Sequence, residues 1–381
     1  MPRSEQRNYD DYSYSTTVKE KENAGSLSPF TYLCTVLIIS LLGLVILYSS
    51  SYQKAIAEGL PHYYYFFRNL VAGLVALAIS FGINLSLPYR ILKVRYFLLP
   101  LTLVLLVLSI VPSFSEGGYI VISGYRIINP SYLAMFSLPF FASRFFGDVR
   151  KGKGYYIFAV LAVVMMLLSL ISAGIGWYLI LIISFAVLMR ISGEGIARTG
   201  ISFFILLLLG FIVSSVFPAT TLEPVISSVY TAPDNPLEIA GSAIEAGGIT
   251  GCGLGNGLFK HYLIASTESD YIFASFAEEV GYLGTAVLIV LLVFISVLGV
   301  RTVARAKMRH DLPSAMTVAA FTLFIVLASA VNMLYVAGFL PLPGVLLPFF
   351  SYDPAFEFIS VLSSSMLYRL IYIMGRSNEK K

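Results

Sequence analysis

The chain has 381 residues, of which 57% are hydrophobic and only 12% charged, and its formal net charge is +4. A soluble domain of this length could not keep so much apolar surface from water, so the composition excludes a soluble enzyme or a nucleic-acid-binding protein. We therefore predict an integral membrane protein that crosses the bilayer many times.

In chain order, residues 1–28 are polar, with acids and bases mixed and no apolar core before a cleavage site, which predicts a disordered cytoplasmic tail. A spanning helix needs roughly 20 mostly apolar residues, and about ten such runs follow. The sequence thus predicts an all-α polytopic domain over residues 29–375 and a short cytoplasmic tail over 376–381. We place the spans at Tyr32–Tyr48, Phe66–Ile83, Tyr96–Val111, Tyr132–Phe146, Tyr156–Ile171, Ile175–Met189, Ile201–Phe217, Ile272–Val300, Ala315–Ala337 and Val345–Met374.

Basic residues predict the orientation, because Lys and Arg stay on the cytoplasmic side of a membrane. They cluster in the breaks after even-numbered spans, whereas the break Pro218–Tyr271 carries six acidic residues against the single base Lys260. We therefore expect both termini in the cytoplasm and a long extracytoplasmic loop between helices 7 and 8. Ionisable residues are scarce at mid-membrane depth, so chemistry is expected at the outer ends of the spans.

The first unusual outward-facing segment runs from Glu116 to Ser131 and has an apolar core too short to span. It is expected to dip into the membrane or to lie on it, where Arg126 would meet a phosphate group as a multi-donor cation. A loop whose Arg126 extends to lipid headgroups is an equal alternative.

The second segment combines a glycine-rich string, which includes Gly253 and Gly255, with acidic residues around the start of a helix. Closely spaced glycines let backbone amides approach an anion. Asp270 stands where the chain re-enters the membrane, and it is either a helix cap or a reactive acid. Glu278 and Glu279 follow below the interface, where they need partners or a water-filled cavity.

The third segment, from Asn332 to Glu357, contains three prolines at expected membrane depth, Pro341, Pro343 and Pro348. Proline breaks a helix, so this stretch is expected to be irregular chain that lines a cavity.

These blocks resemble the SEDS family, the shape, elongation, division and sporulation proteins typified by RodA and FtsW. The resemblance covers most of the chain and is carried by Leu-Tyr48-Ser-Ser-Ser51, the glycine-rich string, Asp270-Tyr-Ile-Phe, Glu278-Glu279-Val-Gly-Tyr-Leu-Gly284, and Gly-Phe-Leu-Pro341 to Ser351-Tyr352. It implies a ten-helix glycosyltransferase of the bacterial cytoplasmic membrane. Such an enzyme polymerises lipid II with inversion, beside a class B penicillin-binding protein and other division or elongation membrane proteins.

The resemblance also implies residue roles. Asp270 matches the essential aspartate of the family and is the candidate general base for the attacking sugar hydroxyl. Lys260, Arg126 and the backbone of Gly253 and Gly255 are candidates to bind the pyrophosphate, and Glu279, Asn332 and Ser351 are further candidates for substrate binding. The sequence indicates no metal ligands and no cofactor, and it leaves room for a divalent cation.

Four family motifs are replaced in this chain. Arg-Trp aligns with Tyr119-Ile120, Gln-Pro-Ser-Glu and a following Lys with Asn129-Pro-Ser-Tyr132 and Met135, Gln-Pro-Asp with Ser172-Ala-Gly174, and Gly-Gly-Ser-Ser with Asp353-Pro-Ala-Phe356. Besides a divergent polymerase, two alternatives therefore stand: a lipid II flippase, and a catalytically silent scaffold of the cell-wall machinery. The matching blocks are common to the division and elongation branches.

Overall fold

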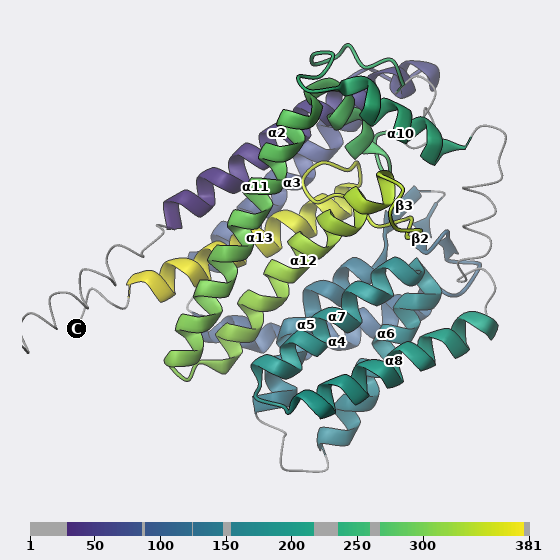
Figure 1. The fold of residues 1–381 in the computed structure, drawn as a ribbon. Helices are drawn as coiled ribbons and strands as arrows, with labels where there is room; N and C mark the ends of the chain where they lie inside the picture. The colour runs from purple at the N-terminus through teal and green to yellow at the C-terminus, as the bar shows by residue number, and fades with distance from the viewer. Residues whose placement is uncertain are drawn as a thin grey trace, which may run out of the picture.

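The computed structural model describes residues 29–85, 88–123, 125–147, 154–216, 235–259 and 267–376. Long helices form one bundle, in which the N-terminal and C-terminal helices begin and end at the same end of the molecule (Figure 1). The predicted tails, 1–28 and most of 376–381, lie outside the described residues.

Each predicted span overlaps a helix in the structure. Among the described residues, six helices are long and apolar enough to cross a membrane, and the chain is a multi-pass membrane protein. The helices are α2 Pro29–Ala57, α3 Tyr64–Leu85, α4 Pro88–Leu108, α5 Pro130–Gly147, α6 Gly154–Ala173, α7 Ile175–Ile191, α8 Ile196–Val216, α10 Pro236–Gly247, α11 Ile272–Met308, α12 Leu312–Val336 and α13 Pro354–Arg376.

The last predicted span begins too early. Residues 337–353 form turns and irregular chain, as the prolines predict, and α13 starts only at Pro354 with Asp353 as an acceptor for the first helical amides. Its buried start lies below the surface of the bundle, so the irregular chain lines the interior.

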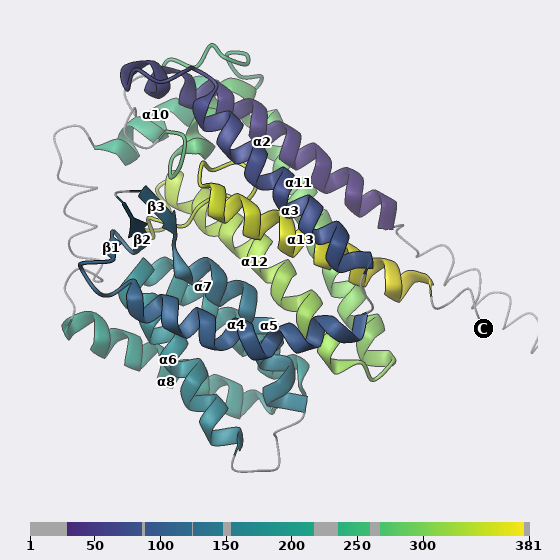
Figure 2. The same ribbon diagram turned by 180° about the vertical axis from the view of Figure 1, so that it is seen from behind.

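The prediction of an all-α chain is wrong at one place. Residues of the first unusual segment form a three-stranded antiparallel sheet of β1 Ser115–Glu116, β2 Tyr119–Ile122 and β3 Tyr125–Ile128. Gly117 and Gly118 have φ of +57° and +81°, which glycine adopts without strain, and they close the turn between β1 and β2. The sheet lies at the same end of the bundle as α10 (Figures 1 and 2).

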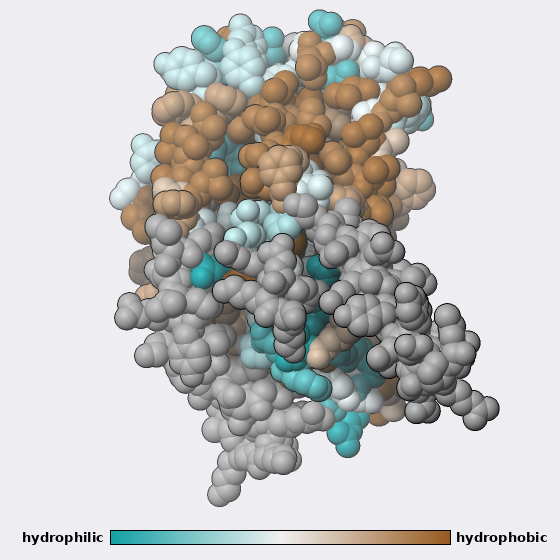
Figure 3. Space-filling model, turned by 90° about the vertical axis from the view of Figure 1, so that its left-hand side faces the viewer, coloured by the Kyte–Doolittle hydropathy of each residue, from teal (hydrophilic) through white to brown (hydrophobic). Residues whose placement is uncertain are grey.

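Apolar side chains are exposed along the outer faces of α2 and α11, among them Leu41 at 62% and Val290 at 64%. Figure 3 shows them as a broad hydrophobic band. A face of this kind is stable in lipid and not in water. The turn between α11 and α12, with Arg305 and Arg309, lies at the opposite end from α10 and the sheet (Figure 1). This arrangement agrees with the basic residues lying on one side, while the sidedness itself stays a prediction.

Candidate functional site

The segment Thr267–Tyr271 is held in place through its backbone. The carbonyl oxygen of Glu268 accepts from the amide of Tyr352 at 2.7 Å, and that of Ser269 accepts from Ser351 Oγ at 2.8 Å. The carbonyl oxygen of Asp270 accepts from Asn332 Nδ2 at 3.1 Å. Three consecutive carbonyls are thus fixed by the 332–352 region, which sets the direction of the Asp270 side chain.

Asn332 and Ser351 therefore contact the backbone of this segment and not the Asp270 carboxylate. Asn332 is fully buried and also donates to the carbonyl oxygen of Val345 at 2.8 Å, whereas Ser351 Oγ also accepts from the amide of Leu347. The sequence predicted that Asn332 and Ser351 bind substrate. In the structure both side chains donate to the backbone of the Asp270 segment and position it.

Asp270 itself is not a helix cap. The N-cap position of α11 is Tyr271, which makes no side-chain capping bond, and no described residue donates a hydrogen bond to the Asp270 carboxylate. Burial, together with the nearby charge of Glu268, raises the pKa of Asp270 from 3.8 to about 6. A partly buried carboxylate with a pKa near neutrality is suited to accept a proton.

Glu268 is paired with a lysine that sequence reasoning missed. Lys54 Nζ, at the end of α2, lies 2.6 Å from Glu268 Oε1 and 5.6 Å from the ring centre of Tyr65. Burial raises the pKa of Glu268, and Lys54 opposes that rise. One signal in the sequence was its position, because Lys54 is a base at the end of an apolar helix that the orientation rule predicts to be extracytoplasmic, where bases are rare.

The glycine-rich string folds back onto the start of α11. The amide of Gly253 donates to the carbonyl oxygen of Glu279 at 3.0 Å, and the amide of Gly255 donates to Glu279 Oε2 at 3.0 Å. Ser49 donates to the other oxygen of Glu279. These two glycine amides thus donate to Glu279 in this structure and are not open donors, while their role in binding a pyrophosphate stays a prediction.

The same string also provides partners for Glu278. Its Oε1 atom accepts from the amides of Leu258 and Phe259, and its carbonyl oxygen accepts from the amide of Cys252. Both acids therefore have hydrogen-bond donors in the structure, while Glu278 Oε2 is buried without one. Glu278 and Glu279 thus accept hydrogen bonds that hold the glycine-rich string against α11.

The two predicted pyrophosphate cations differ in outcome. Lys260 lies outside the described residues. Arg126 is exposed on β3, where its guanidinium is 2.8 Å from Glu116 and 5.8 Å from the ring centre of Tyr119. It is therefore at the outer surface of the sheet, beside the site and already paired.

Three of the replaced motif positions meet in space. Tyr119 Oη and Tyr132 Oη lie 2.8 Å apart, and they donate to Asp353 Oδ2 at 2.9 and 3.0 Å. The other oxygen of Asp353 accepts from the amides of Ala355 and Phe356 at the start of α13. We refer to Tyr119, Tyr132 and Asp353 as the Tyr–Tyr–Asp cluster, and the replaced motifs are a mutually bonded set.

The fourth replaced motif supports the same region. Ser172 Oγ accepts from Ser109 Oγ at 2.8 Å and donates to the carbonyl oxygen of Gly118 at 3.3 Å. It thereby fixes the turn that precedes Tyr119. As to metals, no group of three His, Cys, Asp or Glu side chains in the described part of the chain could hold an ion.

Comparison with known proteins gives matches along most of the chain. A family model described as cell cycle protein, of the FtsW, RodA and SpoVE type, matches residues 30–374. The probable peptidoglycan glycosyltransferase FtsW of Saccharophagus degradans is 26% identical, over 92% of this chain and 94% of that protein. The protein of the same name from Coxiella burnetii is 25% identical, over 93% and 98%.

Solved structures show the same fold. A chain of a peptidoglycan synthase complex superposes with a TM-score of 0.68 at 22% identity, covering 90% of this chain and 97% of that one. The rod shape determining protein RodA of Thermus thermophilus superposes with a TM-score of 0.62 at 21% identity, covering 90% and 96%.

Proposed function

Because the chain belongs to the FtsW/RodA/SpoVE family of cell cycle proteins, we propose that it is a peptidoglycan glycosyltransferase that polymerises lipid II at the outer face of the bacterial cytoplasmic membrane. Its role lies in cell division or elongation. The relatives named as probable glycosyltransferases match along nearly the full length of this chain, which supports the proposal.

The observation that carries the proposal is the state of Asp270. The backbone carbonyls of Glu268, Ser269 and Asp270 each accept a hydrogen bond from the 332–352 region. The Asp270 carboxylate receives no hydrogen bond from a described residue, and its pKa is raised to about 6. A group held rigidly but left without partners can take a proton from a substrate hydroxyl once the two are in contact.

The reaction then follows from the charges. A sugar hydroxyl of one lipid-linked saccharide attacks the anomeric carbon of another, and its proton passes to Asp270. The new glycosidic C–O bond forms as the bond to the lipid pyrophosphate breaks, which inverts the anomeric centre. The pyrophosphate leaves as an anion and needs cationic surroundings, for which Lys260 and the exposed side of Arg126 are the candidates. A divalent cation is compatible with the same step.

The Tyr–Tyr–Asp cluster bears on whether the chain is active. Two phenols stand where the family motifs have charged residues, and both donate to Asp353, which stands in a third replaced motif. This wall of the site is therefore rebuilt and not merely lost. A self-consistent wall favours a divergent enzyme over a silent scaffold. We also propose a class B penicillin-binding protein, together with other division or elongation membrane proteins, as partners.

Polymerisation of lipid II by the purified protein, with its penicillin-binding partner, tests the proposal. We expect glycan from the wild type and none from Asp270→Asn, while Glu238→Gln, which alters an exposed acid on α10, should retain full activity. Lipid II that crosses vesicle membranes without forming polymer would instead identify a flippase. Full complementation by Asp270→Asn in cells that depend on the protein would leave the scaffold role.

A further inference from the structure

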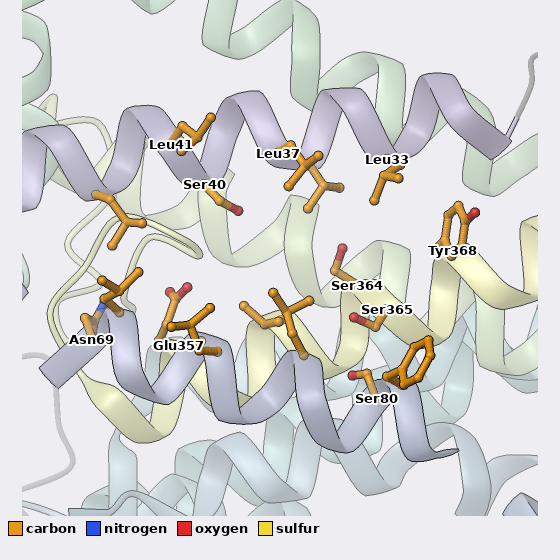
Figure 4. Close-up of a pocket in the computed structure, with 18 of the residues that line it drawn as sticks. Leu33, Leu37, Ser40, Leu41, Asn69, Ser80, Glu357, Ser364, Ser365 and Tyr368 are labelled. Atoms are coloured by element: carbon orange, nitrogen blue, oxygen red, sulfur yellow. The ribbon is translucent and has the colours of Figure 1, made fainter. Parts of the chain in front are cut away.

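A cavity of about 440 Å³ lies between α2, α3 and α13, away from the carboxylate of Asp270. Leucine is the most frequent residue in its walls, for example Leu37, Leu41 and Leu77. Polar side chains, including Ser40 and Glu357, lie between the apolar ones (Figure 4). Along α3 it extends from Asn69 to Phe81, which at 1.5 Å per residue is about 18 Å. The cavity is therefore long, narrow and parallel to the helices.

The outer end of this cavity holds an acid without a partner. Glu357 is 4% exposed, its Oε2 atom has no hydrogen bond, and Figure 4 shows its carboxyl group directed into the space below α2. A buried carboxyl group at membrane depth is costly unless something pairs with it. Nothing in the catalytic proposal uses it.

A second acceptor lies beside the acid. Asn69 is 1% exposed and donates through Nδ2 to the carbonyl oxygen of Ser351, which leaves its Oδ1 atom unpaired. Gly73, one turn further along α3, faces the Glu357 carboxyl group, so both acceptors belong to one end of the cavity. No Lys or Arg is among the described residues that line it.

The cavity is reached from the lipid side. Leu41 of α2 and Leu74 and Phe81 of α3 line it and are also 62%, 56% and 67% exposed. An entrance between apolar helix faces admits a hydrocarbon chain laterally. A partner helix about 10 Å across would not fit a space of this volume and length.

We propose that this cavity binds one chain of a bilayer phospholipid whose head carries a primary ammonium group, of the ethanolamine type, with Glu357 and Asn69 accepting hydrogen bonds from that ammonium. An ammonium group offers three donors and a positive charge, which suits two unpaired acceptors that include an acid. A phosphate presented alone would meet only acceptors there and would be repelled.

The site also adjoins the catalytic support. Asn69 contacts the carbonyl of Ser351, and Ser351 contacts the carbonyl of Ser269 next to Asp270. A bound lipid would therefore contact Asn69, the first residue of this series of hydrogen bonds.

Photolabelling tests the assignment. The full protein in nanodiscs is labelled by an ethanolamine phospholipid with a diazirine in one acyl chain, and the adducts are located by peptide mass spectrometry. We expect adducts on the cavity faces of α2, α3 or α13. Unlabelled ethanolamine phospholipid should displace the probe about tenfold more effectively than glycerol phospholipid of the same chains, the factor that one charge-assisted hydrogen bond supplies.

Two variants make the test specific. Glu357→Leu removes an unpaired acid, so the variant should fold. The preference for ethanolamine phospholipid over glycerol phospholipid should fall from about tenfold to near unity. Leu77→Trp fills the cavity and should abolish labelling there, whereas Glu238→Gln should leave both unchanged. Equal displacement by the two lipids in the wild type, labelling unaffected by Glu357→Leu and Leu77→Trp, or displacement by a polyprenyl phosphate alone would each overturn the proposal.

Discussion

Asn332 and Asp270 are joined by a hydrogen bond of 3.1 Å that runs from a side-chain amide to a backbone carbonyl and leaves the Asp270 carboxylate untouched. The fully buried amide on α12 thus controls where the acid points without competing for its proton. The two residues therefore have different roles: Asn332 orients Asp270, and Asp270 accepts the proton.

The variant Asn332→Ala tests this positioning role. It leaves the carbonyls of Asp270 and Val345 without their donor, so we expect about 2 kcal/mol lower stability and a lower kcat with little change in KM. Ser329→Ala is the control, because Ser329 lies one turn earlier and donates only to Ile325 of its own helix. Thermal unfolding and polymerisation rates measure the two effects, and equal effects of both variants would contradict the role.

Asp270→Asn is expected to stabilise the protein while it removes activity. The folded state holds the pKa of Asp270 at about 6, above the ordinary 3.8, so folding favours the protonated acid and stability falls as pH rises through that range. Asparagine resembles the protonated acid but does not ionise, so the variant does not lose this stability as pH rises.

The gain should be near zero at pH 4 and reach at most about 3 kcal/mol above pH 7, at 1.36 kcal/mol per pKa unit. Melting temperatures measured against pH in detergent check it. A gain that is the same at both pH values would mean that ionisation of Asp270 is not its cause.

Glu268→Gln should change the pH dependence of polymerisation. The charge of Glu268 contributes to the raised pKa of Asp270, after burial. Without that charge the pKa of Asp270 falls, so the acidic limb of kcat/KM, near pH 6 in the wild type, should move to lower pH. Glu245→Gln, which alters an exposed acid on α10, should leave the limb in place. A limb that moves to higher pH after Glu268→Gln would contradict the electrostatic account.

The helices could be predicted from the sequence because a run of apolar residues long enough to span a bilayer has few other structures open to it. The sheet at 115–128 could not, since its strands of two to four residues are shorter than any periodic signal. Its formation depends on the two glycines of the turn and on Ser172, which is distant in sequence.

The acid at the centre of the candidate site could also be predicted, through its motif, but its surroundings could not. The glycine string predicted open amides, yet Glu279 of the next motif accepts from them, because two buried acids needed donors. In the sequence, each replaced motif indicated only that the family's residues are absent. Only the fold shows that Tyr119, Tyr132 and Asp353, which stand in three of the replaced motifs, are hydrogen-bonded to one another.

That joint replacement predicts energetic coupling within the Tyr–Tyr–Asp cluster. Asp353→Asn keeps an acceptor for the amides of Ala355 and Phe356, because Asn is as good an N-cap as Asp, but it removes the charge that the two phenols face. In a double-mutant cycle with Tyr119→Phe, we therefore expect a coupling energy of about 1–2 kcal/mol from the charge-assisted hydrogen bond.

Tyr282→Phe gives the matched control cycle. Tyr282 is half-exposed on α11, so its change should add to that of Asp353→Asn within about 0.5 kcal/mol. Unfolding free energies of the two singles and the double decide each cycle. Strict additivity of Tyr119→Phe with Asp353→Asn would show that the phenol does not depend on the carboxylate, and the replaced motifs would then be independent losses.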